Sequence, residues 1–211
     1  MAAVTTPVVR LSYPHLFKPK ANDKVDMLYQ AALIFPKDMR AAYEALKLPE
    51  PLIQKSLERM EEMKKVAAAT AIEYYGSKEK VPVAIKQMDL AKGSGWPFRD
   101  QKEKVDPDRE DNAPYEAGGL FLNANSKNKP QCVDRKKMPL DEEDLYAGCW
   151  VIASLSCFGF KNSGNTGISF GLGNIQKICD GDRLGGRSTA AQDFDDIEDF
   201  GDTSASADSL F

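Results

Sequence analysis

The strongest constraint on the fold is an alternating run of residues from position 147 to 160. One face carries Cys149, Val151, Ala153, Leu155 and Cys157, and the other carries Trp150, Ile152, Ser154, Ser156, Phe158 and Phe160. Successive side chains of a strand point to opposite faces, so this pattern predicts a long strand. Ile168, Phe170 and Leu172 repeat the pattern after the turn-forming residues 161–165, which indicates a β-hairpin. Gly171 and Gly173 permit the sharp coiling of small closed barrels.

The remaining pattern mixes strands with helices. Further strands are predicted at residues 8–13, 28–35 and 119–124. Asp38 is placed to cap a short helix, and apolar residues recur at helical spacing over residues 51–75, where Gly76 ends a long helix. Residues 86–117 are rich in Gly, Pro and charge, which indicates a long surface excursion. The fold class is therefore expected to be α+β.

Charge divides the chain into two parts. Residues 188–211 contain seven Asp or Glu and no Lys or Arg, whereas residues 1–187 hold 28 basic and 25 acidic residues. The first part therefore carries +3 and the second −7. Blocks of like charge are commonly disordered interaction segments. We expect a mildly basic folded domain at 1–187 and a disordered acidic tail at 188–211.

The sequence contains no feature of a membrane or secreted protein. No stretch approaches the roughly 20 apolar residues of a membrane-spanning helix, and the N-terminal residues lack the basic and apolar regions of a secretory signal. The four cysteines form no C-x-x-C pair, and Cys149 and Cys157 fall in an apolar run, which indicates reduced, buried thiols. A cytoplasmic protein without membrane contact is expected.

Motifs for catalysis and for metal binding are weak. His15 is the only histidine, so neither a catalytic triad nor a histidine-rich metal centre can be assembled. Residues 181–188 reproduce the spacing of a phosphate-binding loop, but Arg187 replaces its lysine and no helix follows. Asp180 and Asp182, with tail carboxylates, are an alternative as metal ligands of a nuclease. We expect no cofactor, no metal and no enzymatic activity.

Aromatic residues interleaved with cations are the more informative pattern. Trp96 and Phe98 stand among glycines and a proline and are followed by Arg99, Lys102 and Lys104. Aromatic rings stack on the bases of single strands without reading sequence, at about 1–3 kcal/mol per base, while cations bind the phosphates. This loop is therefore predicted to contact single-stranded nucleic acid, in preference to a core position for its rings.

A second cluster follows the outer face of the long strand. Trp150, Phe158 and Phe160 share that face and lead to Lys161, so they are further candidates for base stacking. The alternative is that the long helix covers this face, because large aromatic residues usually serve packing. Phosphate contacts are predicted for a nearby set of cations, which a solvated loop would also explain: Lys127, Lys129, Arg135, Lys136 and Lys137.

The acidic tail combines carboxylates with a few apolar residues. Its carboxylates resemble a nucleic-acid backbone and are expected to compete with DNA for the cationic surface. Apolar residues in such a tail suit a linear motif that docks into a partner protein, the alternative being a tail that only increases solubility. The residues assigned to partner binding are Asp195, Asp196, Glu198, Asp199, Phe200, Asp202, Leu210 and Phe211.

Several segments resemble a family of tailed-phage single-stranded-DNA-binding proteins. They are residues 11–17 (LSYPHLF), 33–37 (LIFPK), 146–151 (YAGCWV), 167–177 (GISFGLGNIQK) and 180–184 (DGDRL). The resemblance covers nearly the whole chain. It implies an OB-fold barrel with added helices, no catalytic activity, a role in phage replication or recombination, and a tail that recruits replication enzymes.

Taken together, the sequence predicts a five-stranded OB-type barrel with helical insertions that binds single-stranded DNA with little sequence preference. Partners are expected to be single-stranded DNA and, through the tail, replication or recombination proteins, with assembly of several copies on DNA left open. The alternatives are a metal-dependent nuclease or nucleotide-handling enzyme, and a recombination protein that anneals complementary strands.

Overall fold

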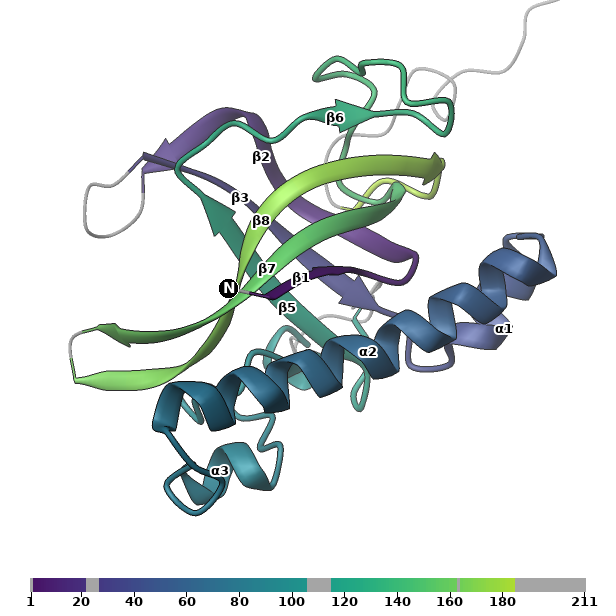
Figure 1. Cartoon of the computed structure of the whole chain (residues 1–211). Coiled ribbons are helices and arrows are strands. Elements are labelled where there is room, and N and C mark those ends of the chain that lie inside the picture. The colour runs from purple at the N-terminus through teal and green to yellow at the C-terminus, as the bar shows by residue number, and fades with distance from the viewer. Residues whose placement is uncertain (1, 22–26, 106–114, 163, 185–211) are drawn as a thin grey trace, which may run out of the picture.

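The computed structural model describes residues 2–21, 27–105, 115–162 and 164–184 (Figure 1). The strands are β1 (Ala2–Thr5), β2 (Val9–Ala21), β3 (Met27–Phe35), β4 (Arg99–Asp100), β5 (Leu120–Ser126), β6 (Cys132–Val133), β7 (Trp150–Asn162) and β8 (Asn165–Cys179). The helices are α1 (Met39–Ala45), α2 (Glu50–Tyr75) and α3 (Val83–Lys86), with a 3₁₀ turn, η1, at Gln101–Glu103. The α+β class and the long β7–β8 hairpin are confirmed.

Strand pairing closes a five-membered circuit. Antiparallel pairs join β7 to β2, β2 to β3 and β3 to β5, after which β5 runs parallel to β8 and β8 returns to β7. The short strands branch from this circuit, β1 on β7, β4 on β5 and β6 on β8. A small five-stranded barrel of this kind is the OB-type barrel that the sequence predicted.

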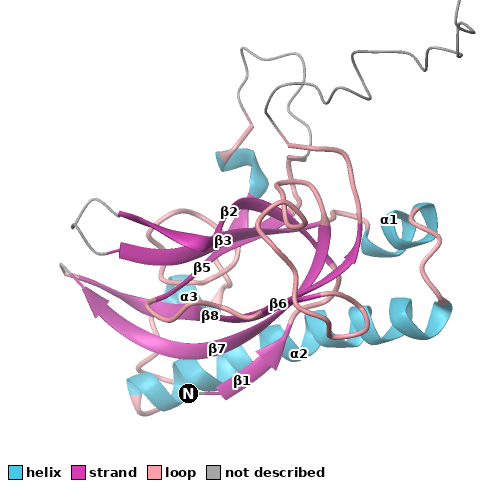
Figure 2. Ribbon diagram, turned by 90° about the horizontal axis from the view of Figure 1, so that it is seen from above, coloured by secondary structure: helices cyan, strands magenta, loops and turns pink. Residues whose placement is uncertain are grey.

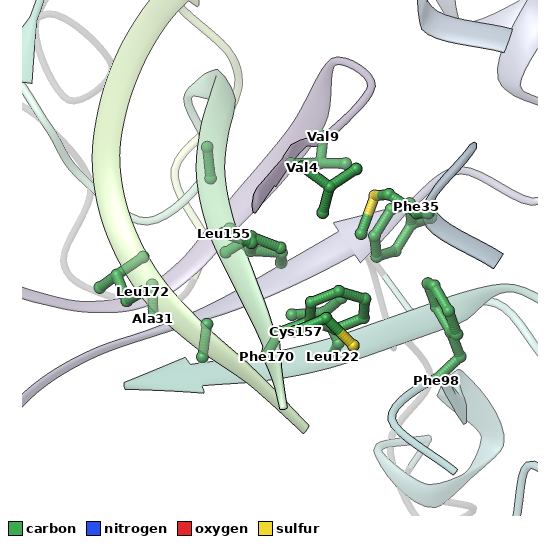
Figure 3. Packing of buried hydrophobic residues seen from close by; sticks show 14 of the residues in the cluster. Val4, Val9, Ala31, Phe35, Phe98, Leu122, Leu155, Cys157, Phe170 and Leu172 are labelled. Carbon is green, nitrogen blue, oxygen red and sulfur yellow. The ribbon is translucent and has the colours of Figure 1, made fainter. Parts of the chain in front are cut away.

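The barrel interior is filled by the buried faces of these strands. Val151, Ala153 and Cys157 of β7 are fully buried, as the alternating pattern predicted. They meet aliphatic and aromatic side chains from the other strands, among them Leu33, Leu122 and Phe170, in one continuous cluster (Figure 3). Buried Cys149 has its thiol pKa raised by burial to about 11, so this group stays a neutral thiol at physiological pH.

Local signals set the ends of the two longer helices. Asp38 caps α1 by accepting a hydrogen bond from the Ala41 amide at 3.0 Å. The long helix α2 ends at Gly76, whose φ of 84° is a left-handed conformation that favours glycine. Both boundaries were predicted from the sequence. None of the helices in the described part of the chain is long and apolar enough to cross a membrane.

The long helix packs on one side of the barrel. It contacts β1, β7 and β8, and it buries Met60, Met63 and Ala67 in the barrel core. Seen from above, α2 runs along the β1 and β7 side, while β2 and β3 lie on the opposite side (Figure 2). The outer face of β2, β3 and β5 is therefore left free of α2.

Candidate nucleic-acid interface

A groove of about 380 Å³ lies on this free outer face. Strand register creates it, because Gln30 of β3 lies opposite Asn125 of β5, and Ala32 lies opposite Asn123. The small side chain of Ala32 leaves space for the groove, while the three amide side chains supply hydrogen-bond donors and acceptors. The full lining is Tyr13, His15, Lys20, Gln30, Ala31, Ala32, Lys104, Asn123, Ala124 and Asn125.

Tyr13 is the exposed aromatic residue of this groove. The pairing of β2 with β3 shifts register between Ser12 and His15, and Tyr13 in this bulge has a φ of 46°. That conformation is unusual for a bulky residue. Pro14, which has no amide hydrogen to donate to the ladder, follows directly. The bulge turns the Tyr13 ring outward, where it is 60% exposed and free to stack on a base.

Cations border the groove. The Lys104 ammonium lies 5.6 Å from the centre of the Tyr13 ring and 5.7 Å from that of buried Phe121. Lys20 lines the groove as well, and no carboxylate is among its lining residues in the described part of the chain. Lys129 follows β5 and lies 5.5 Å from the ring centre of Phe17 in β2. The arrangement offers positive charge beside exposed aromatic and amide groups, which suits a single-stranded nucleic acid.

His15 adds a group that titrates in the groove. Its pKa is lowered from the usual value of 6.5, first by partial burial and then by the charge of Lys20. The imidazole is therefore neutral at pH 7. It adds a positive charge only when the solution is more acidic.

Trp96 and Phe98 occupy positions that differ from the predicted ones. Trp96 is 5% exposed and Phe98 only 1% exposed, and both belong to the barrel core. The Phe98 ring lies 5.9 Å from that of Phe35 and 5.8 Å from that of Phe170, both in edge-on geometry. The prediction that a loop presents these rings to solvent was wrong, because packing in the aromatic core removes their large apolar surface from water.

The cations after Phe98 are divided between structural and exposed positions. Arg99 forms an ion pair with Glu103 and lies 4.8 Å from the ring centre of Phe121, so most of its guanidinium is engaged within the protein. Lys102 is exposed, and its ammonium lies 3.9 Å from the Asp100 carboxylate. Of this predicted cluster, Lys104 alone lines the groove.

The predicted residues of the long hairpin are placed differently at its two ends. Trp150 is half-buried against a small cluster that includes Tyr43 of α1 and Ile53 of α2. Helices therefore cover this end of the face. Phe158 and Phe160 are half-buried near the tip, and Lys161 is exposed.

Trp150 also borders a second hollow of about 210 Å³, which Arg10 and Lys37 line as well. The Arg10 guanidinium lies 6.0 Å from the centre of the Trp150 ring. Ile34 reaches this hollow from the outer face of β3, the same strand face that carries Gln30 and Ala32. Beyond the groove along β3, the protein therefore carries two further cations, with the Glu116 carboxylate beside them.

The remaining predicted cations lie in two places. Lys127 is exposed directly after β5, next to the groove, whereas Arg135, Lys136 and Lys137 are exposed on a turn after β6. The Asp134 carboxylate holds this turn by accepting hydrogen bonds from the amides of Lys136 and Met138 at 2.7 and 2.8 Å. The turn follows β6, which pairs with β8. The eight tail residues assigned to partner binding lie outside the described residues.

Asp180, considered above as a metal ligand, is engaged in a different role. Its carboxylate pairs with Lys177 at 2.8 Å and accepts a hydrogen bond from the Tyr146 hydroxyl at 2.9 Å. The Arg183 guanidinium lies 4.1 Å from the centre of the Tyr146 ring. Among the described residues, no group of three or more His, Cys, Asp or Glu side chains is placed to hold a metal ion. These contacts fasten the chain where it leaves the barrel towards the tail.

Sequence reasoning missed the groove residues Tyr13, His15, Lys20, Gln30, Asn123 and Asn125. A partial signal was present, because Pro14 directly follows the predicted strand at residues 8–13, and proline in a sheet is confined to edges, strand starts and bulges. The amides carried no signal of their own. Gln30 lies in a segment that is otherwise apolar on both faces, and its partners lie almost a hundred residues away.

The fold and the groove together define a class. In OB-fold proteins, strands 2 and 3 of a five-stranded barrel present the face that binds oligonucleotides and oligosaccharides. In chain order the five barrel strands are β2, β3, β5, β7 and β8, so β3 and β5 are the second and third, and the groove lies on their outer face. The protein is an OB-type barrel whose groove lies on the face that corresponds to the oligonucleotide-binding face of other OB folds.

Comparison with known proteins gives the family. A family model described as Enterobacter phage Enc34, ssDNA-binding protein, matches residues 2–204, and the chain belongs to this family. A solved structure of the single-stranded DNA-binding protein from bacteriophage Enc34 in complex with ssDNA is similar, at 22% identity and a TM-score of 0.58, over 87% of this chain and 89% of that one. The C-terminally truncated Enc34 protein is similar at 21% identity and a TM-score of 0.54, over 86% and 88%.

A curated relative is similar over a shorter range. Putative protein p50 of Acyrthosiphon pisum secondary endosymbiont phage 1 is 38% identical over 84 residues, which are 38% of this chain and 45% of that protein. The match therefore spans less than half of the relative. At the identities of the solved structures, the likeness establishes the OB-type fold.

Proposed function

We propose that this protein binds single-stranded DNA without cleaving it and with little sequence preference, and that the strand lies along the groove on β2, β3 and β5. Membership of the phage family supports the substrate. The observation that carries the location is the exposed Tyr13 ring beside Lys104, over a floor of small and amide residues. A flat ring and amide groups suit unpaired bases, while lysines suit the phosphates.

The groove gives this proposal its first test. Replacing Tyr13 with Ala removes an exposed ring and is expected to weaken binding of a labelled single-stranded oligonucleotide by about 5- to 150-fold, from about 1–3 kcal/mol per stacked base. Val83→Ala is the matched control, because Val83 is 65% exposed on α3 and is not among the residues that line the groove. Equal affinity of the Tyr13 variant and the control would refute the groove as the site.

Salt dependence tests the phosphate contacts. Affinity is expected to fall steeply as salt is added, because bound lysines release counterions from the strand. Lys104→Ala should lower the slope of log affinity against log salt concentration by about 0.7, the value for one single-strand phosphate contact. Lys65→Ala on the exposed side of α2 is the control and should leave the slope unchanged. A slope that is the same in all three proteins would contradict this assignment.

The non-catalytic part of the proposal is tested with magnesium. Long incubation of labelled single-stranded and duplex DNA with the protein and magnesium should leave both intact. Shortened DNA, made by protein that is free of contaminating nuclease, would favour a nuclease instead. Rapid pairing of complementary oligonucleotides by the protein would favour an annealing role in recombination.

For the acidic tail we propose two separable roles in phage replication or recombination in the host cytoplasm. Its carboxylates compete with DNA for the groove, and Leu210 and Phe211 bind a replication or recombination protein. Deleting residues 188–211 should tighten DNA binding, whereas Phe211→Ala should reduce co-purification of a partner and leave DNA affinity nearly unchanged. Unchanged or weaker DNA binding after the deletion would refute the competition.

A further inference from the structure

An apolar groove of about 210 Å³ lies between the end of α2 and α3, on the opposite side of the molecule from β2 and β3 (Figure 1). Ile72 and Met88 on its wall are 41% and 44% exposed, although both are large apolar side chains. Trp96 and Ile85 form its buried part. An apolar cavity of about 150 Å³ is enough to bind benzene, so this groove has room for one phenyl ring.

The rim of this groove carries two lysines. Lys78 and Lys86 are among the lining residues, and both are exposed. The Lys86 ammonium donates a hydrogen bond to the backbone carbonyl oxygen of Glu79 at 2.9 Å. The Glu79 carboxylate also interacts electrostatically with both lysines. One acidic and two basic groups leave the rim with a net positive charge. The groove thus suits an aromatic side chain flanked by carboxylates.

The tail of this chain supplies such residues. Phe200 has Glu198, Asp199 and Asp202 within two positions, whereas Phe211 has no acidic residue within two positions. Charge therefore favours Phe200 over Phe211 as the occupant.

Chain length favours Phe200 over the other tail phenylalanine, Phe194. In Figure 1, α3 lies at one end of the molecule, and the end of β8, which leads to Leu184, lies at the other. A globule of this size has a radius of gyration of about 16 Å and is about 40 Å across. Ten residues from Leu184 to Phe194 span at most about 35 Å, which is less than the width of the molecule, while the sixteen to Phe200 span at most about 55 Å when fully extended.

We propose that the α2–α3 groove binds Phe200 of the same chain, with Glu198, Asp199 and Asp202 at the lysine-bearing rim. A tail held in this way is fixed to the side of the barrel away from β2 and β3. While Phe200 is docked, the neighbouring carboxylates are held away from the groove on β2, β3 and β5, so they compete with DNA only after Phe200 has left the α2–α3 groove. A partner that binds residues 198–202 must first release Phe200 from this groove, whereas one that binds only Leu210 and Phe211 need not.

Zero-length carbodiimide cross-linking of the full-length protein without DNA tests the docking. Mass spectrometry of the monomer is expected to find Lys78 and Lys86 joined to the carboxylates of residues 198–202. Phe200→Ala should reduce these links by at least about tenfold, the effect of removing a central buried ring. Phe194→Ala and Phe211→Ala are the matched controls and should keep them.

Ile72→Glu tests the α2–α3 groove itself, because it replaces an apolar residue of the groove wall with a charged one. Ile72 is already 41% exposed on α2, so the fold should persist and thermal unfolding by circular dichroism should be unchanged, while the links disappear. Links that survive in the Phe200 or Ile72 variant, that spread evenly over all exposed lysines, or that join only two different copies would each overturn the proposal. Because no DNA is present, such a result would leave the DNA groove untouched.

Discussion

Replacing Phe98 with Ala separates a core role of this residue from a role in DNA binding. Its ring is 1% exposed and meets Phe35, Phe170 and Trp96 at centroid distances of 5.8–5.9 Å. Truncating a buried phenylalanine to alanine costs about 3–5 kcal/mol. That is a large part of the roughly 5–15 kcal/mol that stabilises a typical domain.

The thermal midpoint of Phe98→Ala should fall by roughly 6–20 °C, since 1 kcal/mol shifts a protein of this size by about 2–4 °C. Circular dichroism during heating and during urea titration gives this value. Binding of a labelled oligonucleotide is then measured well below the lowered midpoint. There the folded fraction is high, and the affinity should match that of the unsubstituted protein.

Phe98→Leu keeps the comparison valid if the alanine variant does not fold. Leucine restores most of the apolar volume, so most of the stability should return. A leucine cannot stack on a base as a ring does, so a stacking role would leave DNA binding weak in both variants. Full thermal stability together with weak DNA binding in either variant would refute the core placement of Phe98.

Two further predictions concern the end of the barrel and the groove. Gly148 has a φ of 118°, and an added Cβ would overlap the carbonyl oxygen of Asp182. Gly148→Ala should therefore lower the free energy of unfolding, measured by urea titration, by about 1–3 kcal/mol. Unchanged stability would contradict this contact. DNA affinity should rise as pH falls below 6.5, because neutral His15 then gains a positive charge beside the bound DNA. In a His15→Gln variant, the same pH titration should lack this rise in affinity. An equal rise in both proteins would contradict the assignment.

The sequence predicted those parts of the fold that depend on local pattern. Alternation over residues 147–160 identified β7 and its buried face, and Asp38 and Gly76 marked helix boundaries that the structure confirms. These signals are local, because each follows from the conformation of a few neighbouring residues. The strand β1 carried no such signal, since its four residues are held by pairing with β7, about 150 positions away.

The candidate site was harder to predict, because long-range pairing decides which side chains reach the surface. Trp96 and Phe98 stand in a Gly- and Pro-rich segment, which usually indicates an exposed loop. Directly after them, however, β4 pairs with β5, and the buried Gln101 side chain donates hydrogen bonds to the carbonyl oxygens of Phe35 and Leu120 at 2.7 and 2.9 Å. These contacts hold the segment on the barrel and direct both rings inward.

The open groove also depends on where the helical insertion packs. Helices α1 and α2 lie between β3 and β5 in the chain, so α2 could in principle cover the outer face of the strands that flank it. Instead its end packs against β7, where an added Cβ at Gly159 would overlap the Tyr74 ring. Glycine at this position allows the helix to approach β7 closely. A bulkier residue there would displace the end of α2 and change the shape of the α2–α3 groove, whereas the groove on β3 and β5 would keep its shape.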